Sequence, residues 1–527
     1  MAGLLRSGGI SGVLLAGHQF VTLTTSPAAD DRMLAAQVLG MVGLRSFYHP
    51  LLRLLEDPDG DVRRSALHAA GEVKHPHLWP QVIAALARPG ERGAATTALV
   101  RGGDSIQSVT EAYFDDPGRR HDIAIRLTRV LRHIPDGWVI TLLASRLDEP
   151  ATEWRSEILH ALADHGYHSP PAQTASVTRR VQSETAYAAL LLRVRGDWEQ
   201  EPACALLIRA LNHELQEIRR RIFLWLSFIY DAQALQQAQL ALMYGDRTER
   251  SYAVEVIDGL ISTGLKPFVL PLLDEPQPEQ QLAQLTAGSS PAAGHAVGRL
   301  AALIEGRQDM YTSWVRTCAC YLAGRIPQSE YRMALAAARG APDILLQATA
   351  DWAFSQLETG ARSSEPMYST LERVIILKTI EIFAETPDVV LAEIATIMNE
   401  VDLEAGHTIF EKGTLGTSMY VIIEGQVRVH DSGHTLNMLG ERAVFGEMAM
   451  LDPEPRSASV TAVKDSKLFV IEHAPFYDVL ADRVEVARGI IRVLAGYVRA
   501  RMRDVAALHA RVEALEGVVH DHQRGPD

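Results

Sequence analysis

Residues 445–462 read FGEMAMLDPEPRSASVTA, and this stretch decides how the C-terminal third of the chain is interpreted. Gly446 precedes Glu447, and Arg456 follows that glutamate nine residues later. A glycine allows the backbone to approach a ligand closely. Arginine presents a planar fork of N–H donors that suits a phosphodiester, whereas lysine presents a point charge. The spacing predicts a site in which a carboxylate and a guanidinium lie close together.

These two charges suit a sugar that is fused to a phosphate. A carboxylate repels a phosphate unless it faces a hydroxyl donor, and a ribose 2′-OH is such a donor. A short helix predicted from Glu447 to Leu451 adds backbone N–H groups that hold an anion. A 3′,5′-cyclic nucleotide combines the sugar hydroxyl with the phosphodiester, so it is the predicted ligand.

The stretch resembles the phosphate-binding cassette of the cyclic-nucleotide-binding domain family, which has the pattern FGE-[LM]-A-x6-R-[ST]-A. The resemblance covers about 120 residues, roughly 377–498. Arg442 stands where the family usually has a second glycine. The residues that fall on the pattern are Gly446, Glu447, Met448, Ala449, Arg456, Ser457 and Ala458.

The resemblance implies a role for most of these residues. Glu447 would bind the ribose 2′-OH, and Arg456 would bind the cyclic phosphate. The amide of Ala449 and the hydroxyl of Ser457 would bind the phosphate oxygens. A serine after the arginine is compatible with either purine, and the resemblance favours cAMP over cGMP. The candidates to line the base are Val427, Met438, Val444, Tyr497 and Arg499.

From Val401 onward, short apolar runs alternate with glycines at intervals of about ten residues. The runs are HTIFEKG, SMYVIIEG, QVRVHDSG, TLNMLG, SASVTAV and SKLFVIEH. This pattern predicts a compact barrel or jelly roll of antiparallel strands. The flanking segments ERVIILKTIEIF and PFYDVLADRVEVARGIIRVLAGYV have the helical period.

The N-terminal two thirds of the chain repeat a different pattern. The segment DVRRSALHAAGEV (61–73) places small apolar residues on one helical stripe, and similar helices are predicted near 91–100, 121–134 and 152–165. Leucine-rich segments lie between them. Such helix pairs bury their apolar faces only by stacking, so the pattern predicts a solenoid that resembles HEAT repeats. The alternative is an irregular helical domain.

The fold class is therefore α+β and multidomain: a HEAT-like helical solenoid, then a β-roll with flanking helices and a long C-terminal helix. Beyond the roll, apolar residues recur every seven positions from Val484 to Val519, which favours a parallel coiled-coil homodimer. A single helix packed on its own domain is the alternative. The expected parts are an N-terminal segment (1–30), HEAT-like repeats (31–270), a polar loop (271–294), further HEAT-like helices (295–358), a linker (359–372), the cyclic-nucleotide-binding domain (373–483) and the C-terminal helix (484–527).

Composition and charge exclude several other classes of protein. The net charge of −14 argues against a general binder of nucleic-acid backbones. The three cysteines cannot form a disulfide framework, and His75 and His77 have no partner at metal-site spacing, so no metal is expected. No segment approaches the roughly 18 apolar residues of a membrane span, so we expect a cytoplasmic protein. We expect adjacent arginines such as Arg63 and Arg64 to form solvated faces or ion pairs between repeats.

The predicted function is that of a regulatory protein, not an enzyme, in which a cyclic nucleotide controls a HEAT-repeat scaffold that engages a protein partner. No kinase signature, P-loop or HExxH motif is present. About 28 residues follow Arg499, which is too few for a DNA-binding helix-turn-helix domain. One alternative is a structural scaffold whose roll binds nothing. Another is the soluble tail of certain bacterial membrane transporters, which the HEAT repeats, the MYSTLERVIILK segment and the roll together resemble. An enzyme that acts on nucleic acid is disfavoured by the acidic charge.

Overall fold

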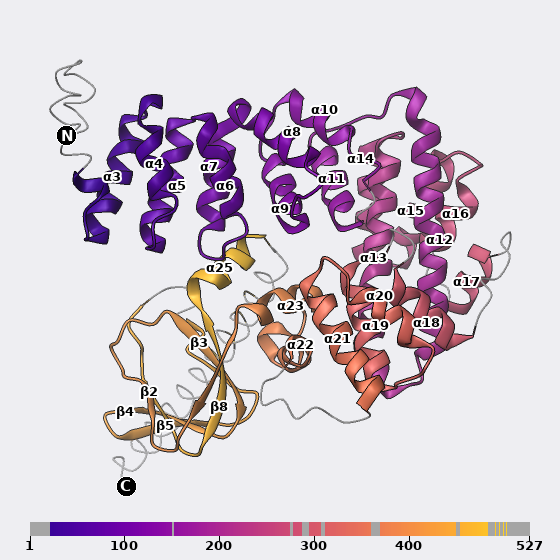
Figure 1. The fold of residues 1–527 in the computed structure, drawn as a ribbon. Coiled ribbons are helices and arrows are strands. Elements are labelled where there is room, and N and C mark those ends of the chain that lie inside the picture. Colours follow the sequence, from indigo (N-terminus) through magenta and orange to yellow (C-terminus); the bar gives the residue numbers. More distant parts are fainter. Residues whose placement is uncertain are drawn as a thin grey trace, which may run out of the picture. The chain divides into compact units, whose positions relative to one another are not determined.

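The computed structural model describes residues 22–149, 152–273, 278–286, 295–306, 311–359, 369–448 and 454–482, and the single residues Ile491, Ala495, Arg499 and Met502. The chain divides into two compact units, residues 1–364 and 365–527 (Figure 1). The predicted C-terminal helix 484–527, with its heptad pattern, lies outside the described residues apart from those four positions.

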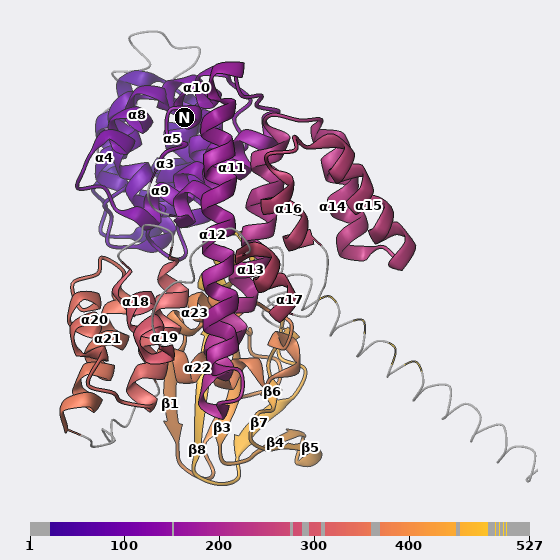
Figure 2. The ribbon, with the colours of Figure 1, turned by 90° about the vertical axis from the view of Figure 1, so that its right-hand side faces the viewer.

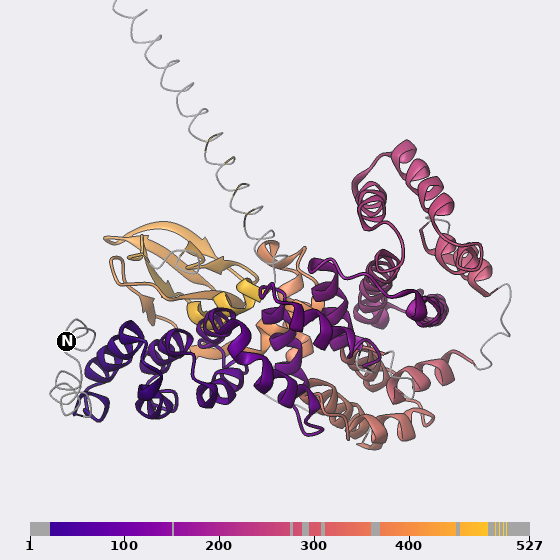
Figure 3. The ribbon, with the colours of Figure 1, turned by 90° about the horizontal axis from the view of Figure 1, so that it is seen from above.

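The first unit is built from helices that follow one another in antiparallel pairs (Figures 1 and 3). The four helices predicted from small residues are confirmed as α5, α7, α9 and α11. The helices of this part are α3 (Ala29–Val42), α4 (Tyr48–Leu54), α5 (Gly60–Val73), α6 (Trp79–Ala85), α7 (Arg92–Gly102), α8 (Gln107–Asp115), α9 (His121–Leu131), α10 (Gly137–Ala144) and α11 (Thr152–Asp164).

The small residues are required because the helices of successive pairs approach closely. A methyl group placed on Gly71 of α5 would lie 2.9 Å from the Cα of Ala98 on α7. A methyl group on Gly40 of α3 would lie 3.0 Å from the Cα of Ala69 on α5. A larger side chain at either glycine would push the two backbones apart, so the stripe of small residues sets the spacing of the stack.

Arginines connect each helix pair to the next. Arg32 lies 2.6 Å from Asp57 and also donates to the carbonyl of Ser26. Arg63, 31 residues later, repeats this arrangement with Glu91 at 2.6 Å and the carbonyl of Asp57. These contacts confirm the predicted ion pairs between neighbouring pairs of helices for Arg63.

The first unit continues with ten further α-helices in the described residues, of which α12 and α13 are the longest. Two of them, α12 and α13, span 25 and 23 residues and pack against each other, and α14 lies beside α15 (Figure 2). These helices are α12 (Thr174–Trp198), α13 (Ala205–Ser227), α14 (Ala232–Tyr244), α15 (Arg247–Leu260), α16 (Lys266–Leu273), α17 (Pro278–Thr286), α18 (Ala296–Glu305), α19 (Ser313–Arg325), α20 (Tyr331–Ala338) and α21 (Ile344–Thr359).

The prediction of one continuous polar loop over 271–294 is wrong where the structure describes it. Residues up to 273 belong to α16, and 278–286 form α17. Proline at the first helical position is favourable, and the glutamate, glutamines and leucine that follow are good helix formers. Gln281 is buried and donates to the carbonyl of Pro271 at 2.9 Å, so α17 is held against α16.

A buried ionic cluster joins α12 to α13. Arg221 is 2% exposed and donates to Glu184 and to Glu214, each at 2.9 Å. Burial raises the pKa of Glu214 to about 7, although the guanidinium of Arg221 acts in the opposite direction. Arg155 lies 4.0 Å from Glu184, so two buried cations face two carboxylates here, and the pKa of Glu214 is raised chiefly by its removal from water.

The second unit contains α22 (Thr370–Lys378), α23 (Asp388–Thr396) and α25 (His473–Asp482) around a β-roll. One sheet has the order β1-β8-β3-β6 and the other β2-β7-β4-β5. Six strands lie in the predicted runs; β1 and β6 were not predicted as strands. The strands are β1 (Asn399–Leu403), β2 (Thr408–Phe410), β3 (Ser418–Glu424), β4 (Val427–Asp431), β5 (His434–Leu439), β6 (Val444–Phe445), β7 (Ser459–Ala462) and β8 (Ser466–Glu472).

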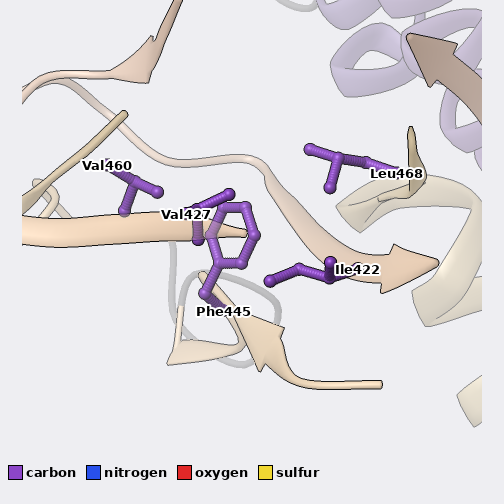
Figure 4. Close-up of a cluster of buried hydrophobic side chains, with 5 residues drawn as sticks. All are labelled: Ile422, Val427, Phe445, Val460 and Leu468. Carbon is purple, nitrogen blue, oxygen red and sulfur yellow. The ribbon is translucent and has the colours of Figure 1, made fainter. Parts of the chain in front are cut away.

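The core of the roll lies between its two sheets. Ile422, Phe445 and Leu468 come from one sheet, and Val427 and Val460 come from the other (Figure 4). Side chains alternate between the two faces of a strand, so the residues next to these five in each strand point to the other face of their sheet. The core therefore fixes which residues of the roll face its interior.

Two further findings concern the whole described chain. Cys204, Cys318 and Cys320 are buried thiols that form no disulfide, and burial raises the pKa of the Cys204 thiol to about 11 and that of Cys320 to about 12. These thiols are accordingly structural residues of the helices.

In the part of the chain that the structure describes, no helix combines the length and the apolar character that a membrane crossing requires.

The raised pKa of Glu214 predicts that the helical unit loses stability as the pH rises. The folded unit keeps this proton up to about pH 7 while the unfolded chain releases it near pH 4.5, a difference worth about 3 kcal/mol. The stabilisation is complete below pH 4.5 and disappears as the pH approaches 7. Glu214→Gln should remove about 2–3 kcal/mol of the difference in unfolding free energy between pH 5 and pH 8.

Urea unfolding followed by tryptophan fluorescence measures this difference in the helical unit alone, because all seven tryptophans lie within residues 79–352. Glu255→Gln, an exchange at an exposed position of α15, is the control and should leave the pH dependence unchanged. An equal pH dependence in the Glu214→Gln variant and the parent would contradict the prediction.

Candidate functional site

Arg456 lies inside the roll, three residues before the start of strand β7. Its backbone N–H donates to the carbonyl of Thr414 at 2.8 Å, and its own carbonyl accepts from the N–H of Gly413 at 2.8 Å. These bonds tie the residue to the turn that joins β2 to β3. The side chain is consequently directed inward, and the residue is only 8% exposed.

The guanidinium of Arg456 is held by two backbone carbonyls and one aromatic ring. One terminal nitrogen donates to Ser418 O at 2.7 Å and the other donates to Gly446 O at 3.2 Å. The central carbon lies 4.1 Å from the ring centre of Phe410. A guanidinium has five N–H donors, so these two hydrogen bonds leave three donors for a ligand.

The positive charge of Arg456 has no ion-pair partner among the residues that the structure describes. Burial lowers the pKa of its guanidinium, and the nearby Tyr420, Glu447 and Glu472 act in the opposite direction. Buried charges in proteins are normally paired, because an uncompensated charge is costly to remove from water. The arrangement therefore suits an anion that arrives from outside the chain.

Gly446 is required by both conformation and space. Its φ of 76° lies in the left-handed region, which side chains disfavour. A methyl group at this position would lie 2.7 Å from a terminal nitrogen of Arg456 and 3.1 Å from Ser418 O. The glycine thus allows its own carbonyl to accept a hydrogen bond from the arginine.

The other residues of the predicted motif are placed around this arginine. Glu447 is partly buried and close enough to influence the pKa of Arg456, although the two form no ion pair. Ser457 is exposed and Ala458 is partly buried, while Met448 is 66% exposed. Ala449 and most of the predicted helix from Glu447 to Leu451 lie outside the described residues.

The three base-lining candidates in the roll do not share one face. Val427 is fully buried in the core with Phe445. Met438 lies next to Leu439, the partner of Val427 across the strand pair, so it points to the opposite face and is 41% exposed. Val444 likewise precedes Phe445 and faces away from the core.

Two candidates came from the predicted C-terminal helix. Tyr497 lies outside the described residues, and Arg499 is exposed.

The turn before the motif keeps a left-handed residue although it lacks the second glycine of the family pattern. Arg442 has a φ of 66°, and its N–H donates to the carbonyl of Ile422 at 2.7 Å. The hydrogen bond to β3 holds the arginine in a conformation that glycine would adopt without strain. Arg442 therefore adopts the left-handed backbone conformation that a glycine at this position would adopt.

Sequence reasoning missed two contacts of Arg456. Phe410 was assigned only to the strand and turn pattern, and the carbonyl of Ser418 carries no signal in the sequence. The apolar run that contains Phe410 predicts a strand but does not reveal which residue lies against its ring.

Comparison with protein families identifies the roll. Residues 400–483 match the family described as cyclic nucleotide-binding domain. The match covers the strands of the roll and the residues around Arg456.

Two curated proteins are similar to the same part of the chain. The CRP-like cAMP-activated global transcriptional regulator of Mycobacterium tuberculosis is 29% identical over 138 residues, which are 25% of this chain and 62% of that protein. The cyclic AMP receptor protein of Thermus thermophilus is 35% identical over 99 residues, which are 18% of this chain and 46% of that protein. This chain thus spans less than two thirds of the length of either relative.

Among solved structures, the N-terminal domain of a transcriptional regulator from Streptomyces coelicolor A3(2) is 32% identical, with a TM-score of 0.24. The alignment covers 25% of this chain and 94% of that one. All three similarities fall on a quarter or less of the chain. The family match over residues 400–483 identifies this part of the chain as a cyclic nucleotide-binding domain.

Proposed function

We propose that the roll binds a cyclic nucleotide through Arg456 and Glu447. The observation that carries the proposal is the buried guanidinium, which has three unused N–H donors and no carboxylate partner among the described residues. A cyclic phosphate supplies the missing negative charge and accepts two parallel hydrogen bonds from a guanidinium. Ser457 is exposed beside it and offers a further donor.

The sugar and the base add specificity. Glu447 would accept a hydrogen bond from the ribose 2′-OH, which keeps its charge away from the phosphate. The amide of Ala449 would bind a phosphate oxygen. We propose cAMP ahead of cGMP, since a serine follows the arginine and the two curated relatives are named for cAMP.

We further propose that the nucleotide regulates the helical unit, which acts as a HEAT-like scaffold for a protein partner. Support comes from the stacked helix pairs and from the repeated arginine contacts of Arg32 and Arg63. Stacked pairs of this kind offer extended surfaces to partners. On this view the chain is a cytoplasmic regulator without catalytic activity, and its C-terminal heptads form a homodimer. The rival proposals are a scaffold with a non-binding roll and the soluble tail of a membrane transporter.

Removal of the guanidinium should abolish most of the affinity. Arg456→Ala is expected to weaken cAMP binding by about 2–5 kcal/mol, or about 30- to several-thousand-fold, because a buried phosphate loses its charge partner. Isothermal titration calorimetry with cAMP and cGMP measures both the affinity and the choice of base.

Lys464→Ala is a suitable control, because Lys464 is an exposed cation of the same unit between β7 and β8. It should bind like the parent. If the parent binds neither nucleotide, the roll is not a sensor; if Arg456→Ala binds within threefold of the parent, the phosphate lies elsewhere.

Regulation of the helical unit predicts a change in tryptophan fluorescence when the nucleotide binds. The second unit contains no tryptophan, so any change must arise in residues 79–352. A saturable change with the same midpoint as the calorimetric titration is expected for the parent and should be absent in Arg456→Ala. Unchanged emission at saturating nucleotide would mean that binding does not reach the environment of these tryptophans, contrary to the proposal.

A further inference from the structure

The guanidinium of Arg456 lies over the ring of Phe410. The ring centre of Phe410 and the central carbon of the guanidinium are 4.1 Å apart, well within the distance of a cation–π contact. Phe410 is the last residue of β2, while Arg456 precedes β7, and these two strands are paired. Strand pairing therefore delivers the ring and the cation to the same place.

The ring of Phe410 is itself held in position. It lies 5.8 Å from the ring of Tyr420 and 6.0 Å from that of Phe445, measured between centres. Tyr420 and Phe445 are stacked at 5.0 Å with an angle of 8° between their planes. Phe410 also packs against the core cluster of the roll. Because the ring of Phe410 is already fixed by these neighbours, ligand binding has no conformational entropy to lose by ordering it.

Contact with an aromatic ring leaves the positive charge of the guanidinium in place. A phenyl ring has no acceptor oxygen and no net charge, so it does not neutralise the cation. A carboxylate partner would neutralise the charge that attracts a phosphate. The carbonyls of Ser418 and Gly446 hold the two terminal nitrogens, and the ring of Phe410 lies against the central carbon.

We infer that Phe410 is a positioning residue that holds Arg456 in the orientation in which it binds the nucleotide phosphate. This inference rests on the proposed function and adds to it a residue outside the recognised motif. Phe410 acts through Arg456 and does not contact the ligand. It contributes to the affinity because it holds the side chain of Arg456 in the binding orientation before the ligand arrives.

Phe410→Leu should weaken cAMP binding about 5- to 30-fold, which is the range expected for a partly desolvated cation–π contact. Phe410→Tyr keeps an aromatic face and should restore the affinity to within about twofold of the parent. Phe469→Leu is the matched control: Phe469 is a fully buried ring in β8 of the same roll, and its ring centre lies 5.4 Å from the guanidinium carbon of a different arginine, Arg373. It should lower the thermal stability of the roll without changing the affinity.

A double-mutant cycle separates positioning from general loss of structure. If Phe410 acts through Arg456, then Phe410→Leu should change the affinity by less than twofold in an Arg456→Ala background, because alanine leaves no cation for the ring to hold. Calorimetry of the parent, both single variants and the double variant in the full-length protein provides the four values.

The outcomes distinguish this inference from the proposed function. Binding by the parent, weaker binding by Phe410→Leu, rescue by Phe410→Tyr and a coupled cycle support it. Binding by the parent with no loss in Phe410→Leu, or with additive effects in the cycle, overturns the inference and leaves the proposed function in place. Absence of binding by the parent overturns both.

Discussion

The candidate site depends on one buried guanidinium, that of Arg456, which meets no carboxylate among the residues that the structure describes. Arg456 reaches the interior because its backbone is tied to the turn between β2 and β3, and its side chain is then held by two carbonyls and a ring. Gly446 is needed because any side chain there would collide with that guanidinium. Each of these contacts stabilises the cation only in part, since carbonyls and an aromatic face carry no net charge. An anionic ligand would complete the site.

The helical unit uses arginine in the opposite way. Arg221 is buried to a similar degree, but it faces Glu184 and Glu214, and the cluster holds two helices together. Arg32 and Arg63 join successive helix pairs in the same manner, with a carboxylate of the next pair. A guanidinium that is paired with carboxylates contributes to the fold but is poorly suited to bind an anionic ligand, because its N–H donors and its charge are already engaged. The contrast with Arg456 separates arginines that support structure from one that suits recognition.

Much of the fold could be predicted because local patterns determine local structure. Alternation of apolar residues with glycines located six strands, and a stripe of small residues located the four helices that stack closely. Two predictions failed where tertiary contacts decide. The loop over 271–294 contains α17, which is stabilised by the hydrogen bond from Gln281 to α16. The two-residue strand β6 exists only because β3 lies beside it.

The sequence by itself determined the chemistry of the candidate site: a glycine, a carboxylate and a guanidinium at a spacing that matches a known family. Only the tertiary structure decided how the cation is held. Phe410 and Arg456 are 46 positions apart, so their spacing does not predict the contact. Ser418 contributes a backbone carbonyl, which every residue possesses, so its residue type does not predict the hydrogen bond. The pairing of β4 with β5 and the alternation of side chains along each strand likewise decided that Val427 faces the core while Met438 does not. Residue types set which interactions are available, and strand pairing over long separations sets which of them form.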